Sequence, residues 1–232
     1  MNYYIGIDLG TSAMKGILTD ERGKIVRQES ATYDVIYPQN GWTEQNPSDW
    51  IVALNKVLAE LLCVDKDCGA CGCATVNSQS IAKYVKGISF GGQMHGLVAL
   101  DKHGEVIRPC ILWNDGRTEK QTAYLNEVVC KQTLSELTGN IAFAGFTAPK
   151  LLWMRENEPE NFARIDKIML PKDYLAYYLS GVVATDYSDA SGTLLLDVKN
   201  KRWSQKMANV CGISLQNLPE LHESYDVIGI VK

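Results

Sequence analysis

The segment formed by residues 3–32 constrains the fold more than any other part of the sequence. Apolar residues alternate with polar or small ones on both sides of the turn Gly10-Thr11-Ser12, as they do in half-buried strands. We expect a first strand that ends at Leu9, followed by strands at residues 15–19 and 24–32. Consecutive strands joined by tight turns predict an antiparallel meander.

Helices and further strands alternate in the rest of the chain. Asn46 and Pro47 carry the signals of a helix start, and apolar residues follow at helical spacing from Trp50 to Leu61. This order of elements predicts a mixed-sheet α/β domain. Further helices are expected at residues 118–130 (opened by a capping box), 149–154, 171–181 and 203–210, and further strands at residues 84–90, 96–100, 106–113, 165–170 and 226–231.

The first turn is the strongest candidate for chemistry. Gly10, Thr11 and Ser12 offer backbone N–H groups and hydroxyls to a single anion, which is how a phosphate can be bound without a large charge. Asp8 lies on a strand with apolar neighbours, where an acid is costly unless it serves something such as a hydrated Mg²⁺. Lys15 could reach a phosphate oxygen as a point charge. The alternative is a plain β-hairpin with an acid at its mouth.

A second group of candidate residues follows the strand expected at residues 84–90. Gly91 and Gly92 would let the backbone and a small ligand approach closely. As alternatives, His95 is a structural histidine at a strand end, and Arg117 is a surface residue at a helix start. The hydrogen-bonding residues suited to a polyhydroxylated substrate are Gln93, His95, Asn114, Asp115 and Arg117, with Met94 and Trp113 as apolar walls.

Several of these segments resemble one known family. The motif Asp8-x-Gly10-Thr11-Ser12-x-x-Lys15 looks like the first phosphate motif of the actin/hexokinase-type ATPase superfamily, and more narrowly that of the FGGY carbohydrate kinases. The segment from Gly145 to Asn157 fits the N-terminal signature of that family throughout. Residues 90–96 and 111–117 resemble the sugar-site segments of its xylulokinases. Further similar segments are residues 170–174 and 186–193.

The resemblance implies an α/β fold, namely an actin/hexokinase-like (ribonuclease H-like) ATPase domain with a mixed β-sheet flanked by helices. It implies a kinase that uses ATP and Mg²⁺ to convert D-xylulose to D-xylulose 5-phosphate. Gly10, Thr11, Ser12 and Lys15 would bind the nucleotide, and Asp8 would hold Mg²⁺ through water. The candidate residues at 93–95, 113–115 and 117 would bind the sugar.

The resemblance also implies that catalysis needs more than this chain. In the family, the catalytic base is an Asp in a glycine-rich segment that follows the point where this chain stops. We therefore expect residues 1–225 to be an N-terminal domain and residues 226–232 to begin the next segment, with the second ATPase domain absent. We expect these 232 residues alone to be inactive.

Three other functions stay open. A kinase of another ketose or polyol, of the ribulose or glycerol type, is the nearest rival. A sugar-sensing module on the same fold would keep the sugar pocket and dispense with the phosphate turn. A filament-forming, actin-like protein would keep the phosphate turn and lack the pocket. Asp8→Ala separates the first of these from the second, because it should abolish the activity of a kinase but leave the ligand response of a sensing module intact.

The composition indicates which partners and which cell compartment to expect. The net charge of −4 argues against a nucleic-acid surface, and no stretch approaches the ~20 apolar residues needed to cross a bilayer. The N-terminus lacks the features of a secretory signal, and seven cysteines fit a reducing compartment. We expect a cytoplasmic protein whose partners are a small sugar and its own C-terminal domain, with a homodimer left open.

A group of cysteines carries a separate hypothesis. Cys63, Cys68, Cys71 and Cys73 could together hold Zn²⁺ or an iron–sulfur cluster. The single residue between Cys71 and Cys73 fits structural zinc poorly, so a surface insertion is favoured. The sequence assigns no role to Asp189 or Ser191.

Overall fold

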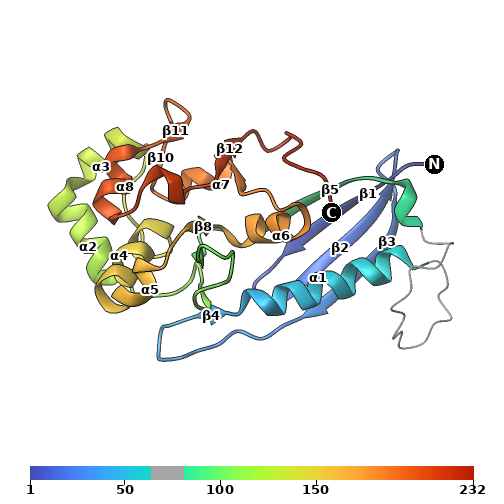
Figure 1. Cartoon of the computed structure of the whole chain (residues 1–232), viewed down its shortest axis with the longest axis horizontal. Coiled ribbons are helices and arrows are strands. Elements are labelled where there is room, and N and C mark those ends of the chain that lie inside the picture. Colours follow the sequence, from blue (N-terminus) through green and yellow to red (C-terminus); the bar gives the residue numbers. More distant parts are fainter. Residues whose placement is uncertain (64–80) are drawn as a thin grey trace. The chain divides into compact units, whose positions relative to one another are not determined.

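A computed structural model of the chain describes residues 1–63 and 81–232. Three members of the cysteine group, Cys68, Cys71 and Cys73, lie outside the described residues. The chain forms two compact units, of which the first is Met1–Tyr33 with Ser48–Gly92 and the second is Asp34–Pro47 with Gln93–Lys232. Figure 1 labels most of their helices and strands.

The first unit contains a four-stranded mixed sheet with the strand order β3-β2-β1-β5. The meander β1-β2-β3 is antiparallel, whereas β5 runs parallel to β1. Both the predicted meander and the predicted mixed sheet are confirmed. The strands are β1 (Tyr3–Leu9), β2 (Ala13–Asp20), β3 (Ile25–Thr32) and β5 (Val85–Gly92), with the short helix η1 (Ile81–Tyr84) before β5.

Helix α1, Pro47–Leu62, covers one face of this sheet and lies along its strands (Figure 1). It begins at the predicted proline. Gly16 of β2 allows the close packing, because a Cβ at that position would lie 2.4 Å from a methyl group of Val57. The apolar stripe of α1 that is buried against the sheet includes Trp50, Leu54, Val57 and Leu61.

The second unit packs helices around short two-stranded sheets. The sheet pairs are β4 with β7, β6 with β8, β9 with β12, and β10 with β11. The strands are β4 (Glu44–Gln45), β6 (Val98–Leu100), β7 (Cys110–Ile111), β8 (Lys167–Met169), β9 (Ala184–Asp186), β10 (Leu196–Asp197), β11 (Arg202–Trp203) and β12 (Glu220–His222). The helices are α2 (Glu119–Tyr124), the π-helix η2 (Leu125–Cys130), α3 (Lys131–Thr138), α4 (Thr147–Asn157), α5 (Pro159–Ala163), α6 (Pro171–Ser180), α7 (Tyr187–Ser191), α8 (Gln205–Cys211) and η3 (Leu215–Asn217).

Helix α4 occupies the core of the second unit. Every residue from Thr147 to Met154 is buried, so the helix is enclosed on all sides rather than along one stripe. Its neighbours in the core include Leu125, Leu134 and Met207, which come from the helices on either side of it in the sequence. Side chains of α4 are therefore placed rigidly.

Two predicted elements of the second unit differ in extent. The strand predicted at residues 106–113 is reduced to Cys110–Ile111, because the preceding Pro109 lacks the N–H that a ladder needs. The helix predicted at residues 118–130 continues to Thr138 through the π-helix. The predicted capping box is wrong, since the Thr118 hydroxyl donates to the carbonyl oxygen of Ala144 instead, at 3.0 Å.

Two predictions near the C-terminus also need correction. The helix predicted from Trp203 begins at Gln205, because Ser204 is its N-cap and accepts a hydrogen bond from the Met207 N–H. Residues 226–232 are described by the structure and form no strand. Across the described part of the chain, no helix combines the length and the apolar character that a membrane span requires.

Candidate functional site

Asp8 lies on the face of the first sheet that is opposite to helix α1. Its register partner on β2 is Lys15, and both side chains are exposed. Its register partner on β5 is Gly91, where a Cβ would meet no atom within 4 Å. The surface beside the Asp8 carboxylate is therefore open toward Gly91, which leaves room for a hydrated cation.

The turn that follows Asp8 is tighter than predicted. The Gly10 N–H donates to the carbonyl oxygen of Ala13 at 3.1 Å, so it is already used within the turn. This N–H is therefore not free for an anion in this structure, and the part of Gly10 in nucleotide binding stays a prediction. Glycine is required for a steric reason, because a Cβ there would lie 2.9 Å from the same oxygen. Thr11 is half-buried and Ser12 is exposed beyond it.

Tyr33, which was not predicted as a site residue, supports this turn. Its hydroxyl donates to the carbonyl oxygen of Gly10 at 2.5 Å, and its backbone N–H donates to that of Ser12 at 3.4 Å. Burial, and secondly the negative charge of Asp8, raise the pKa of Tyr33 well above its usual range, so the phenol remains a donor. An aromatic residue directly after the third strand is the only sequence signal for this role.

The candidate sugar residues of the second unit differ in their exposure to solvent. Met94 and Trp113 are 43% and 42% exposed, as apolar walls of a binding site would be. Gln93 is buried, and its amide nitrogen donates to Gln45 Oε1 at 2.8 Å. The Asn114 side chain is exposed, although its Oδ1 accepts from the Thr43 hydroxyl at 2.9 Å.

His95 is held in an unusual conformation between these residues. Its φ of 64° lies in the left-handed region, which is uncommon for a residue with a side chain. Its ring centroid lies 4.8 Å from that of Phe146, and its carbonyl oxygen accepts from the Thr147 hydroxyl at 3.0 Å. Lys150 Nζ contacts the same oxygen at 3.3 Å. His95 is therefore held in place by helix α4 and by Phe146, the residue that precedes this helix.

Burial keeps the His95 imidazole neutral. Desolvation, and secondly the positive charge of Lys150, lower its pKa from 6.5 to about 4. A neutral ring has one nitrogen that donates and one that accepts a hydrogen bond. Because Nδ1 is buried, Nε2 is the nitrogen through which this ring can pair with a hydroxyl group.

The same shift predicts a pH-dependent stability. Between pH 6.5 and 4 the unfolded chain binds a proton at His95 that the folded chain does not bind. The free energy of unfolding should therefore fall as the pH falls through this range, and less steeply in His95→Gln. Urea midpoints measured from pH 7 to 4.5 test this. The exposed His103 provides the control, and a His103→Gln variant that removed the same pH dependence would contradict the assignment to His95.

Asp115 and Arg117 are buried and paired with each other. Their side chains have no exposed surface, and the Arg117 guanidinium binds Asp115 through two hydrogen bonds of 2.8 Å. The guanidinium also lies 2.6 Å from Glu44 Oε1 and between the rings of Trp42 and Trp153, 3.9 and 4.9 Å from their centroids. The surface alternative for Arg117 is wrong, because its side chain is buried. The sugar contact predicted for these two residues is not visible in this arrangement and stays a prediction. They fix the backbone that carries Trp113 and Asn114.

Lys150 is fully buried beneath the same segment. Its ammonium group donates to the carbonyl oxygens of His95, Gly145 and Phe146. Desolvation lowers its pKa to about 7. Lys150 therefore ties the N-terminal end of α4 to the His95 backbone and supports the fold.

Asp189 belongs to an ion cluster. Lys172 Nζ lies 2.6 Å from Asp173 Oδ1, 2.7 Å from Asp186 Oδ2 and 3.3 Å from Asp189 Oδ2. The lysine thus occupies the position that a bound cation would take among these carboxylates. Within residues 1–63 and 81–232, no group of His, Cys, Asp and Glu side chains is arranged to hold a metal ion.

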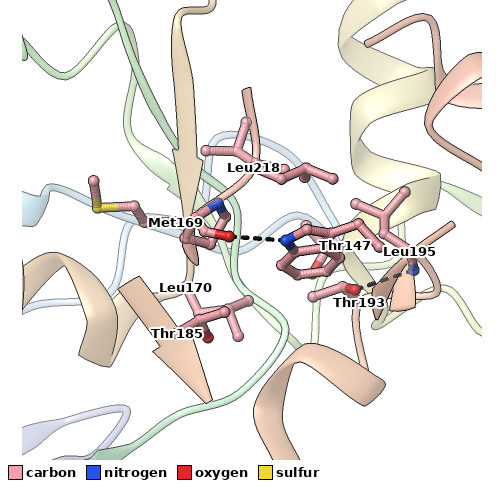
Figure 2. A pocket seen from close by; sticks show the side chains of 10 residues that line it. Thr147, Met169, Leu170, Thr185, Thr193, Leu195 and Leu218 are labelled. Carbon is pink, nitrogen blue, oxygen red and sulfur yellow. Dashed lines mark hydrogen bonds between the residues drawn. The ribbon is translucent and has the colours of Figure 1, made fainter. Parts of the chain in front are cut away.

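The second unit also contains a small cavity of about 10 Å³, shown in Figure 2. This is the lower limit of the space that one water molecule needs. None of the candidate sugar residues lines it, so it is not the predicted sugar pocket. Its lining consists of Thr147, Ile168, Met169, Leu170, Thr185, Thr193, Leu195, Trp203, Leu218 and Pro219.

Comparison with known proteins gives close relatives over the whole chain. The xylulose kinase of Lactococcus lactis is 47% identical over 232 residues, which are 100% of this chain and 44% of the relative. The xylulose kinase of Bacillus subtilis is 44% identical over 99% of this chain and 43% of the relative. This chain thus spans less than half the length of these relatives.

The fold has equally clear counterparts. A crystal structure described as a xyloylose kinase from Brucella ovis superposes with a TM-score of 0.89 at 38% identity, covering 100% of this chain and 45% of that one. The predicted actin/hexokinase-like ATPase fold is confirmed. Residues 3–232 match the N-terminal domain of the FGGY family of carbohydrate kinases. This chain therefore belongs to the FGGY family of carbohydrate kinases.

Proposed function

We propose that this chain is the N-terminal domain of an ATP-dependent kinase that phosphorylates D-xylulose to D-xylulose 5-phosphate. The observation that carries the proposal is His95, a neutral, conformationally fixed histidine that follows the exposed Met94 in a chain 47% identical to a xylulose kinase. Residues 1–225 would form this domain and residues 226–232 the start of the next segment. The catalytic base and the second ATPase domain would lie in the remainder of a longer, cytoplasmic protein.

The first unit would supply the nucleotide side of the reaction. Thr11, Ser12 and Lys15 would bind the phosphates of ATP, and Asp8 would hold Mg²⁺ through water. The exposed Asp8 carboxylate and the open space at Gly91 fit a hydrated cation, which would neutralise phosphate charge when bound.

The second unit would supply the sugar side. Met94 and Trp113 would pack against the carbon skeleton, while His95, Gln93 and Asn114 would hydrogen-bond its hydroxyls. The polar side chains next to this group, Asp115 and Arg117, would act by holding the backbone in place. The chain's own part in the reaction is therefore to orient the ketose and to fix the phosphates.

Thermal unfolding of the 232-residue chain tests the proposal directly. A ligand that binds only the folded state at 100 times its Kd stabilises it by about 2.7 kcal/mol, which corresponds to a rise of several degrees in Tm. We expect this rise with D-xylulose, and no ADP release from the chain alone. A rise with D-ribulose or glycerol but not with D-xylulose would favour another kinase of the family. No rise with any ketose or polyol would contradict the sugar site.

The hydrogen bond between Tyr33 and Gly10 gives a second prediction. Tyr33→Phe removes one partly buried hydrogen bond worth about 1 kcal/mol, so KM for ATP in the full-length protein should rise about fivefold. KM for D-xylulose should stay unchanged, because Tyr33 belongs to the first unit. Tyr37→Phe, at an exposed tyrosine, is the matched control. Equal changes in both KM values would contradict a role specific to the turn.

A further inference from the structure

The segment of residues 186–193, whose polar residues had no assigned function, contacts His95. A Cβ placed on Gly192 would lie 2.2 Å from His95 Cε1 and 2.6 Å from His95 Nδ1. The Cα of Gly192 is therefore seated directly against the imidazole ring. We propose that Gly192 is a positioning residue that sets the orientation of the His95 ring for sugar recognition. This inference rests on the proposed function of His95.

Gly192 is not required by its own backbone conformation. It caps helix α7 with φ −80° and ψ 0°, which residues with side chains also adopt. The glycines that cap α3, α6 and α8, namely Gly139, Gly181 and Gly212, all have positive φ instead. What the fold uses at Gly192 is the missing side chain, which makes room for the ring.

The His95 ring has little freedom to move away from an added methyl group. Phe146 packs against it with a centroid distance of 4.8 Å. The hydrogen bonds from Thr147 and Lys150 hold its carbonyl oxygen, so the backbone cannot easily follow. His95 Nδ1 is buried and has no hydrogen-bond partner among the described residues. Packing against Phe146 and Gly192, rather than internal hydrogen bonding, therefore sets the ring orientation.

Gly192 is equally unable to retreat. Its N–H donates to the carbonyl oxygen of Asp189 at 3.1 Å, and the Asp189 N–H donates to Asp186 Oδ1 at 3.1 Å. Lys172 binds both of these aspartates, as well as Asp173 on helix α6. This ion cluster anchors α7, so a side chain at residue 192 would displace the imidazole rather than the backbone.

A double-mutant cycle in the full-length protein tests the proposal. Gly192→Ala should raise KM for D-xylulose at least tenfold and leave KM for ATP within about twofold. In the His95→Ala background the same substitution should change KM less than twofold, because the ring with which it clashes is gone. Gly87→Ala is the matched control, since a Cβ there makes ordinary contacts from 3.5 Å outward.

The outcomes separate this proposal from the one on which it rests. Equal effects of Gly192→Ala in both backgrounds, or no effect on KM in either, would overturn the role of Gly192. An unchanged KM for D-xylulose in His95→Ala alone would instead overturn the sugar site. If Gly192→Ala does not fold, the double variant with His95→Ala should recover the melting temperature. Failure to recover would show that Gly192 serves the fold and not the ring.

Discussion

Asp8→Asn in the full-length protein is expected to lower kcat by at least about 10²-fold, the largest loss that we predict. The substitution preserves the shape of the side chain and removes the charge. In the structure this carboxylate is exposed beside the open position at Gly91, where a hydrated cation would fit. Initial rates of ADP release, measured over a range of Mg²⁺ concentrations, would report the loss.

The control for this variant is Asp34→Asn, which removes an exposed carboxylate elsewhere in the chain. It should leave kcat unchanged. The rise in Tm that D-xylulose causes should persist in Asp8→Asn, because the sugar residues belong to the second unit. Undiminished ADP release in Asp8→Asn would contradict the role of Asp8. A full-length protein that releases no ADP, and whose D-xylulose response is the same with and without Asp8, would be a sugar-sensing module instead of a kinase.

His95→Ala is expected to lower kcat/KM for D-xylulose by about 10²-fold while KM for ATP stays within about twofold. When a site is built to hydrogen-bond a substrate hydroxyl, removal of the protein partner of that hydrogen bond lowers kcat/KM strongly. The effect should be large here because the ring is fixed in place and neutral, so its hydrogen bonds are pre-organised. Steady-state kinetics with each substrate varied in turn would measure both values.

His103→Ala is the matched control, since His103 is exposed in the turn after β6. It should leave both kinetic constants unchanged. If His95→Asn retains a higher kcat/KM for D-xylulose than His95→Ala, this supports hydrogen bonding, because the amide keeps both a donor and an acceptor. Equal losses for ATP and sugar in His95→Ala would show that the histidine serves the fold instead.

The first unit was predictable because its signals are local. The period-two alternation of residues 3–32 and the tight turns fix β1, β2 and β3. The proline and the apolar spacing fix α1, which begins and ends where the pattern does. The steric need for Gly10 also follows from the turn itself. The engaged Gly10 N–H and the support from Tyr33 do not, because they depend on how the turn closes.

The second unit was less predictable because its contacts are distant in sequence. The partners that bury Arg117, namely Glu44 and the rings of Trp42 and Trp153, lie far from it along the chain. Nothing near Arg117 distinguishes a buried arginine from one that binds a ligand. The two-residue strands β4 and β7 likewise exist only because the fold brings them together. Gly192 could not be linked to His95 for the same reason.

The exposure of Trp113 provides an optical probe of the sugar side. Of the five tryptophans, Trp50 and Trp153 are buried and Trp42 and Trp203 are half-buried, whereas Trp113 is 42% exposed. A collisional quencher such as iodide should therefore act chiefly on the fluorescence of Trp113. A ketose that packs against this indole would shield it, so titrations could follow occupancy of the second unit without any turnover.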